Sequence, residues 1–142
     1  MTFQHISISA AEALDLVRRV ADHAHSREWN VAVAVTDAQG NALASLRMDR
    51  AAPPILDFAQ DKAYTAATMR RSTAAFAERM AETHSLTLGL SNRQRLLAWG
   101  GGLPIVHDGA VIGGIGVSGA KDFEDIECAE VALRALNFGW VL

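Results

Sequence analysis

The sequence predicts an α+β fold in which helices flank a five-stranded antiparallel sheet. Two pairs of short apolar segments are each joined by a turn signal, residues 37–40 (DAQG) in the first pair and Asp108-Gly109 in the second. Such hairpins pair antiparallel, because parallel neighbours need a long crossover connection. Segments with helical spacing of apolar residues lie before, between and after the hairpins, so we expect helices packed on the sheet.

The first third of the chain predicts a strand, a helix and the first hairpin. Residues 3–8 alternate weakly between apolar and polar side chains, which indicates a short strand. Ser9 and Glu12 have the spacing of a capping box, so a helix is expected to begin directly after Ser9. The β-branched run 31–35 predicts a buried strand, and residues 42–47 predict the strand that returns beside it.

Helices are expected to follow the first hairpin. Pro53-Pro54 ends that hairpin, and an alanine-rich helix is predicted over residues 55–70. Its many alanines indicate close packing against the sheet or another helix. A further helix is expected over residues 73–82.

The last third of the chain predicts a short helix, the second hairpin and a final helix. Ser91 and Gln94 repeat the capping-box spacing, so a helix is expected from there through residue 98. The strands of the second hairpin are expected over residues 103–107 and 110–118. Acidic residues crowd the first turn of a helix predicted over residues 123–138, where the helix dipole favours them.

Length, charge and cysteine content limit the classes of function. A chain of 142 residues suits a single domain, residues 1–142, with a core of its own. A net charge of −3 gives no electrostatic reason to expect nucleic acid or an anionic membrane as a partner. Neither a membrane-spanning run nor a secretory signal is recognisable, and the single cysteine, Cys128, fits a reducing compartment. A cytoplasmic location is therefore expected.

Three motifs occur in a fixed order along the chain. The first is VAVTDAQG (33–40) with LRMD (46–49), the second is KAYTA (62–66), and the third combines GGLPI (101–105), GGIGVSG (113–119), Asp125 and Cys128. Together they resemble the GlcG/HbpS family, which is also found as the C-terminal domain of PduO proteins. The resemblance covers nearly the whole chain.

The resemblance implies a profilin-like or PAS-like arrangement and self-association into a homo-oligomer. Some members of the family bind haem, so haem is implied as an alternative ligand. The chain departs from the family's pattern at residues 50–54 (RAAPP), where many relatives have a small turn and a serine, and at Val131-Ala132. The first departure lies at the expected rim of the pocket.

Arg47 and Asp49 are candidate catalytic residues at the end of the second strand. Strand alternation places both side chains on one face, with Met48 on the other. On a pocket wall, Arg47 would bind a carboxylate bidentately and Asp49 would orient it. A surface ion pair at a strand end is an equally good interpretation.

Lys62 and Thr65 lie one helical turn apart and share a face. A lysine among alanines that is partly removed from water would have a lowered pKa, which suits acid/base chemistry or anion binding. The alternative is a lysine whose stem covers apolar surface while its ammonium stays in water. The resemblance favours the first interpretation, with Lys62 catalytic and Thr65 binding ligand.

Glycines and a serine near the second hairpin are candidate ligand contacts. Gly101 and Gly102 would form a flexible lip of the pocket. Ser118 at the end of the last strand could bind an anion together with the helix that follows. Tight packing of helix on sheet is the competing explanation for the glycines of residues 113–119.

Metal chemistry has little support in the sequence. The five histidines form no zinc motif, but one histidine is enough for a haem iron, and His84 is the candidate. Cys128 is expected to be a small buried hydrophobe. Its acidic neighbours raise a thiol pKa, which argues against a role as a nucleophile.

Three functions remain open from the sequence. The first is an enzyme without a cofactor that acts on a small carboxylated catabolite by isomerisation, hydration or elimination, with Arg47 as anchor and Lys62 or Asp49 moving a proton. The second is a haem-binding, haem-sensing or haem-degrading protein, which rests on the resemblance alone. The third is a structural subunit of an oligomer without catalysis.

Overall fold

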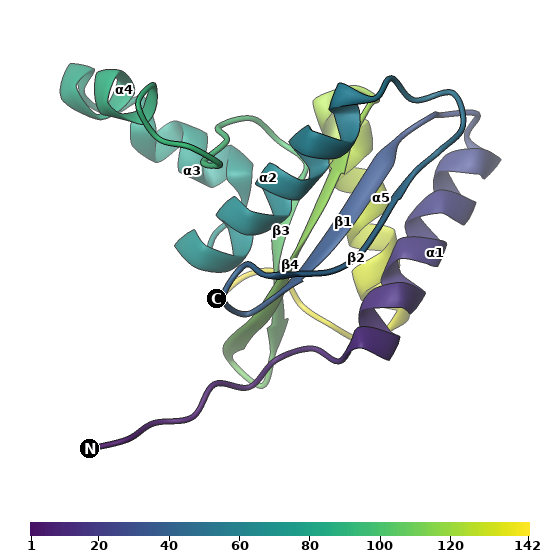
Figure 1. Cartoon of the computed structure of the whole chain (residues 1–142), viewed down its shortest axis with the longest axis horizontal. Coiled ribbons are helices and arrows are strands. Elements are labelled where there is room, and N and C mark those ends of the chain that lie inside the picture. Colours follow the sequence, from purple (N-terminus) through teal and green to yellow (C-terminus); the bar gives the residue numbers. More distant parts are fainter.

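The computed structural model describes all residues, 1–142, and shows a four-stranded antiparallel sheet with five helices (Figure 1). The α+β class is confirmed. The sheet has the strand order β2-β1-β4-β3. Its elements are, in chain order, α1 (Ala10–Ser26), β1 (Ala32–Asp37), β2 (Ala42–Arg47), α2 (Pro54–Met69), α3 (Thr73–Met80), α4 (His84–Leu90), β3 (Gly102–His107), β4 (Ala110–Ser118) and α5 (Asp122–Ala135).

The sheet has a different kind of packing on each face. Branched side chains of β1 and β4, such as Val33 and Ile115, pack with α1 and α5 in the main hydrophobic core. The other face carries α2, whose Ala59 and Ala63 lie against small residues of β1 and β4. A Cβ atom on Gly116 would collide with the carbonyl oxygen of Ala59, so glycine in β4 lets the α2 backbone approach closely.

Local sequence signals confirm several expected boundaries. The hydroxyl of Ser9 accepts a hydrogen bond from the Glu12 amide at 3.1 Å, and the Glu12 carboxylate accepts one from the Ser9 amide. β1 pairs with β2 and β3 pairs with β4, both antiparallel, as the two turn signals predicted. Gly40 in the first turn has a φ of +86°, a conformation that favours glycine.

The predicted fifth strand over residues 3–8 is wrong. Only one backbone hydrogen bond of that segment reaches the sheet, from the Ile8 amide to the Ile112 carbonyl at 2.9 Å. β1 occupies this edge of β4 from Gly113 onward, which leaves room for little more than this one bond. The sheet therefore has four strands.

The predicted helix over residues 91–98 is also wrong. Arg95 has a φ of +69°, which interrupts a helix. The Thr65 hydroxyl accepts a hydrogen bond from the Leu97 amide and donates one to the Arg95 carbonyl, so tertiary contacts hold this segment in another conformation. The helix of this region is α4, which begins earlier, at the N-cap Thr83.

Residues 69–96 form an arm that stands off the body of the molecule (Figure 1). The arm comprises the end of α2, then α3 and α4, and the segment that follows them. α3 packs on α2 and β3, whereas the main packing of α4 is on α3. None of the five helices has both the length and the apolar character needed to cross a bilayer.

Candidate functional site

One cavity is a cleft of about 470 Å³ that we call the tail cleft. Its walls come from the start of β3, the turn between α2 and α3, one side of α5, and the C-terminal residues. A volume of this size falls in the range of ligand sites. Gly101 and Gly102, the candidate ligand contacts, line the cleft, together with Leu103, Pro104, Ile126 and Trp140 as its main apolar surface.

Two arginines stand at the polar side of the tail cleft. Arg70 is the C-cap of α2 in the left-handed conformation, with a φ of +58°, and Arg71 follows it. Both are exposed, and neither has an acidic side chain within salt-bridge distance. Glu130 of α5 is the single acidic residue in the lining. The cleft therefore combines apolar walls with an excess of positive charge.

The C-terminal tail forms one wall of the tail cleft. Gly139 and Val106 exchange two backbone hydrogen bonds of 2.8 and 2.9 Å, which attach the tail to β3. Trp140 packs against the main core, and the guanidinium of Arg134 lies 5.2 Å from the centre of its ring system. Beyond it, Leu142 is 65% exposed.

Lys62 lies directly behind Gly101. Its side chain is completely buried, and its ammonium donates hydrogen bonds to the Val117 carbonyl at 2.8 Å and to the Asp125 carboxylate at 3.3 Å. A Cβ atom on Gly101 would stand 2.6 Å from the ammonium nitrogen, so only glycine backbone separates Lys62 from the cleft. Trp99 covers it from another side, with the ammonium 5.9 Å from the ring.

Burial disfavours the charged form of both partners in this pair. It raises the pKa of Asp125 to about 6, although Lys62 and the Ala120 amide favour the carboxylate. Burial also lowers the pKa of Lys62, against the attraction of Asp125. The sequence indicated a desolvated lysine, but gave no sign that its partner would be Asp125, which was noted only in the third motif and among the acids at the start of the last helix.

Thr65 has a structural role: it holds a neighbouring segment in position. Its hydroxyl is fully buried and fixes residues 95–97, as described above. Beside it, the Arg95 guanidinium lies 4.0 Å from the centre of the Tyr64 ring and 3.6 Å from the Asp61 carboxylate. Thr65 lines none of the five main cavities.

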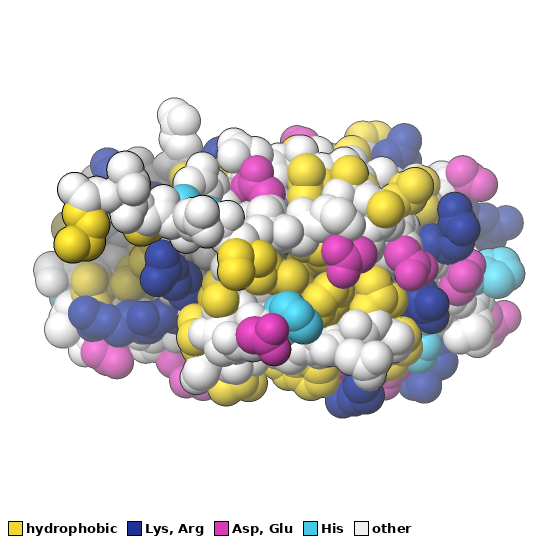
Figure 2. Space-filling model, turned by 90° about the horizontal axis from the view of Figure 1, so that it is seen from below, with side chains coloured by type: hydrophobic (Ala, Val, Ile, Leu, Met, Phe, Trp, Pro, Cys, Tyr) yellow, Lys and Arg dark blue, Asp and Glu magenta, His cyan; other side chains and the backbone are white.

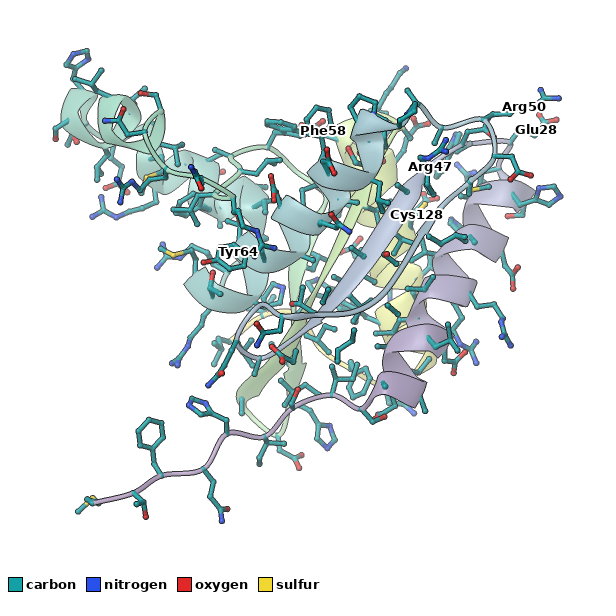
Figure 3. All side chains as sticks on the ribbon, viewed as in Figure 1. Glu28, Arg47, Arg50, Phe58, Tyr64 and Cys128 are labelled. Atoms are coloured by element: carbon teal, nitrogen blue, oxygen red, sulfur yellow. The ribbon has the colours of Figure 1, made fainter.

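Arg47 and Asp49 lie at the end of the sheet where β2 finishes. The Arg47 guanidinium donates a 2.6 Å hydrogen bond to the Ala51 carbonyl, and both side chains are exposed. Figure 3 shows Arg47 on the same end of the molecule as Arg50 and Glu28. Two shallow hollows of about 530 and 390 Å³ share Arg50 here, and Asp49 lines the smaller one.

The structure does not place Arg47, Asp49 and Lys62 around one shared cavity. Lys62 lines none of the five main cavities, and Arg47 points into none of them. One indirect link exists: the Asp125 carboxylate that pairs with Lys62 accepts a hydrogen bond from the Ala120 amide, and Ala120 lines the larger hollow.

The remaining candidates are separate from these cavities. Ser118 ends β4 with its side chain buried, opposite Ala32 of β1. His84 is the first residue of α4, is exposed, and belongs to no group of three or more residues that could hold a metal ion. Cys128 is fully buried in the core, and burial raises the pKa of its thiol to about 12.

The model of the family described as "Haem degrading protein HbpS-like" matches residues 8–134 of the chain. The chain belongs to the HbpS-like family. A relative from Citrobacter freundii, an uncharacterised 15.0 kDa protein of the dhaT-dhaS intergenic region, is 37% identical over 135 residues, which cover 94% of this chain and 95% of that protein.

Solved structures of the same family agree with the fold. The Klebsiella pneumoniae protein ORFY superimposes with a TM-score of 0.89 at 32% identity, covering 96% of this chain and 94% of that one. A complex of PduOC with haem superimposes with a TM-score of 0.86 at 28% identity, covering 96% of this chain and all of that one. The haem belongs to that relative's structure.

The tail cleft fits part of what haem requires. Its apolar walls suit a flat macrocycle, and its arginines suit the two propionates. Among the lining residues there is no histidine, cysteine, methionine or tyrosine to bind an iron ion. His5 lines an adjacent hollow that shares Arg70 and Leu142 with the cleft.

Proposed function

We propose that the tail cleft binds an amphipathic organic acid, a molecule with an apolar body and carboxylate groups, and that haem is one such ligand. The observation that carries this proposal is the pair of unpaired arginines at the edge of an apolar cleft of about 470 Å³. The haem complex of a relative that shares the fold over nearly the whole chain supports the choice of ligand.

Each part of the cleft has a role in this proposal. Arg70 and Arg71 hold the carboxylates, and Leu103, Ile126 and Trp140 contact the apolar body. Gly101 and Gly102 let the ligand lie close to the backbone, since they present no side chain. Bound haem would supply a redox-active iron; the residues of the cleft would bind and orient the macrocycle around it.

A titration with iron-free protoporphyrin and with haemin tests this proposal. Replacing Arg70 and Arg71 together by Ala weakens both ligands by about tenfold, because two ion pairs with carboxylates are lost. The matched control replaces Arg18 and Arg19 on α1 by Ala, and leaves the affinity unchanged. Equal affinities for the two double variants would show that the arginines of the cleft do not hold the ligand.

A second candidate function uses the end of the sheet. Arg50 and Lys121 line the larger hollow there, close to the Arg47 and Asp49 strand end, and provide cations for a small carboxylated catabolite. In this proposal Arg50, which lines both hollows, anchors the carboxylate, and Asp49 in the smaller hollow moves a proton. Arg47 holds the rim through its hydrogen bond to the Ala51 carbonyl. Cofactor-free acid/base chemistry of an isomerase, hydratase or lyase type would follow.

Substitution separates this second function from the first. Arg50→Ala and Asp49→Ala remove exposed side chains, so both variants keep their fold while turnover of any small organic acid is lost. Turnover that survives both substitutions contradicts the second function. Porphyrin binding at the tail cleft is unaffected in either variant, because neither residue lines that cleft.

A further inference from the structure

The tail cleft offers haem two partners for its carboxylates but no ligand for its iron. In proteins the iron of haem is held by histidine, cysteine, methionine or tyrosine. None of these four residue types lines the cleft. A side chain from outside the lining must therefore reach the iron if this chain forms an axial bond to haem.

The cysteine, the tyrosine and three of the methionines lie away from the tail cleft. Cys128 is closed off in the core, and Tyr64 lines none of the five main cavities. Met48 lines the smaller hollow at the end of the sheet. Met69 and Met80 line a hollow between α3 and α4. These side chains are not placed to bind iron in the cleft.

Four of the five histidines also belong to other parts of the molecule. His23 shares a 2.8 Å hydrogen bond with Glu127, between α1 and α5. His25 lines the smaller hollow at the end of the sheet. His84 begins α4 and lines none of the five main cavities. His107 ends β3, whose other end lines the cleft.

His5 is the histidine that lies next to the tail cleft. It lines a hollow of about 290 Å³ that shares Arg70 and Leu142 with the cleft. Both shared residues are exposed, so the boundary between hollow and cleft consists of side chains that solvent already reaches. Arg70 is also a proposed partner of the carboxylates. His5 therefore lies on the side of the cleft where those carboxylates bind.

The segment that carries His5 has no backbone hydrogen bond of its own to the sheet. Residues 1–7 form none, and the first bond to β4 is donated by the Ile8 amide. Figure 1 shows the segment extended and running outward from the start of α1. His5 lies three residues before Ile8, and three extended residues span up to about 10 Å. The segment can therefore swing about Ile8 while the sheet stays unchanged.

Apolar side chains accompany His5 on this segment. Phe3 is 81% exposed and Ile6 is 68% exposed, and the ring of Phe3 lies 5.0 Å from that of His5. Residues two apart in an extended segment share a face, so Phe3 faces whatever His5 faces. Figure 2 shows the molecule from the side of this segment, with hydrophobic and basic side chains together at the left end.

We propose that residues 1–7 close over the tail cleft when haem binds, and that the imidazole of His5 binds the haem iron while Phe3 packs on the macrocycle. The inference rests on the function proposed for the tail cleft. It divides haem binding into two parts: the cleft holds the carboxylates and the apolar body, and the segment supplies the bond to iron. Only the second part needs iron, so iron-free protoporphyrin separates the two.

Titrations of the full chain with haemin and with iron-free protoporphyrin provide the test, read by absorption and electron paramagnetic resonance spectra. Bound haemin in the wild type is expected to show a nitrogen ligand. His5→Ala loses that signature and raises the Kd for haemin by at least about tenfold, whereas the Kd for protoporphyrin stays within about twofold. Added imidazole restores the spectrum, because it replaces the missing ring. His84→Ala and His107→Ala are the matched controls and keep the wild-type spectrum.

The outcomes separate the inference from the proposed function. If protoporphyrin binds and His5→Ala keeps the wild-type haemin spectrum, the inference is wrong and the function of the cleft stands. The same holds if His84→Ala or His107→Ala changes the spectrum in place of His5→Ala. If Arg70→Ala/Arg71→Ala keeps both the spectrum and the affinity for haemin, His5 binds haem away from the cleft. If the wild type binds neither porphyrin, the proposed function fails and the inference fails with it.

Discussion

The ammonium nitrogen of Lys62 lies 3.3 Å from a carboxylate oxygen of Asp125, and both side chains are closed off from solvent. This ion pair joins α2 on one face of the sheet to the first turn of α5 on the other. It lies behind Gly101, at the wall of the tail cleft. Because burial raises the pKa of Asp125, the pair couples the stability of the fold to pH.

Removing one partner of this pair is expected to destabilise the fold strongly. Lys62→Met leaves the Asp125 carboxylate buried with only the Ala120 amide as a partner, at a cost of about 3–5 kcal/mol in the free energy of unfolding at neutral pH. The double variant Lys62→Met/Asp125→Leu recovers part of this loss, because no buried charge remains. Urea unfolding measures the free energy of unfolding of both variants. If Lys62→Met is as stable as the wild type, the ion pair has no structural role.

The raised pKa of Asp125 predicts a specific dependence of stability on pH. Between about pH 4 and pH 6 the folded state binds a proton at Asp125 that the unfolded chain has released, since the folded pKa is about 6 and the ordinary value is 3.8. This contribution to stability is present at low pH and is lost as the pH rises through 6. It amounts to about 2–3 kcal/mol.

A comparison with Asp125→Asn isolates this effect from the other carboxylates. The wild type is expected to gain stability relative to Asp125→Asn when the pH falls from 7 to 4. Unfolding curves at stepped pH measure the difference. If the free energy of unfolding changes with pH in the same way for both proteins, Asp125 has an ordinary pKa.

Two glycine substitutions are expected to act in opposite directions. Gly116→Ala places a methyl group against the backbone of α2, at Ala59 and Ala63, and costs about 3 kcal/mol because the helix must move away from the sheet. Gly89→Ala lies in α4 with nothing within 4 Å of the new methyl group, and stabilises that helix by up to about 1 kcal/mol. Thermal unfolding measures the loss of stability in Gly116→Ala. Amide hydrogen exchange in α4 measures the gain in Gly89→Ala.

The Cys128 thiol is expected to be inert in the native protein. It is completely buried, and its pKa of about 12 leaves almost no thiolate at pH 8. A thiol reagent added at that pH should react only after denaturant unfolds the chain. Fast reaction with the folded protein would show that the core around α5 opens readily.

The order of helices and hairpins could be predicted because its signals are local. The capping box at Ser9, the turn at Gly40 and the Asp108-Gly109 dipeptide each act within a few residues. The errors came from segments whose conformation is decided elsewhere. Residues 3–8 find little free edge on β4, and residues 91–98 are held by Thr65, which is about thirty residues away.

The candidate site was predictable only in part for the same reason. Gly101 and Gly102 line the tail cleft, and the glycine run before a strand that contains them is a local feature of the sequence. Their contact with a ligand stays a prediction. The arginines of the cleft were missed: Arg70 and Arg71 follow an alanine-rich helix with no motif to distinguish them. Their importance depends on α5 and the C-terminal tail lying opposite, which no spacing along the chain reveals.

An amide-resolved NMR titration of the chain with iron-free protoporphyrin tests the central claim most directly. If the tail cleft is the binding site, the amide signals of Arg70, Arg71, Gly101 and Gly102 shift in a saturable way, and those around Arg50 stay in place. Shifts confined to residues 47–52 and 119–121, with the cleft unaffected, would contradict the account.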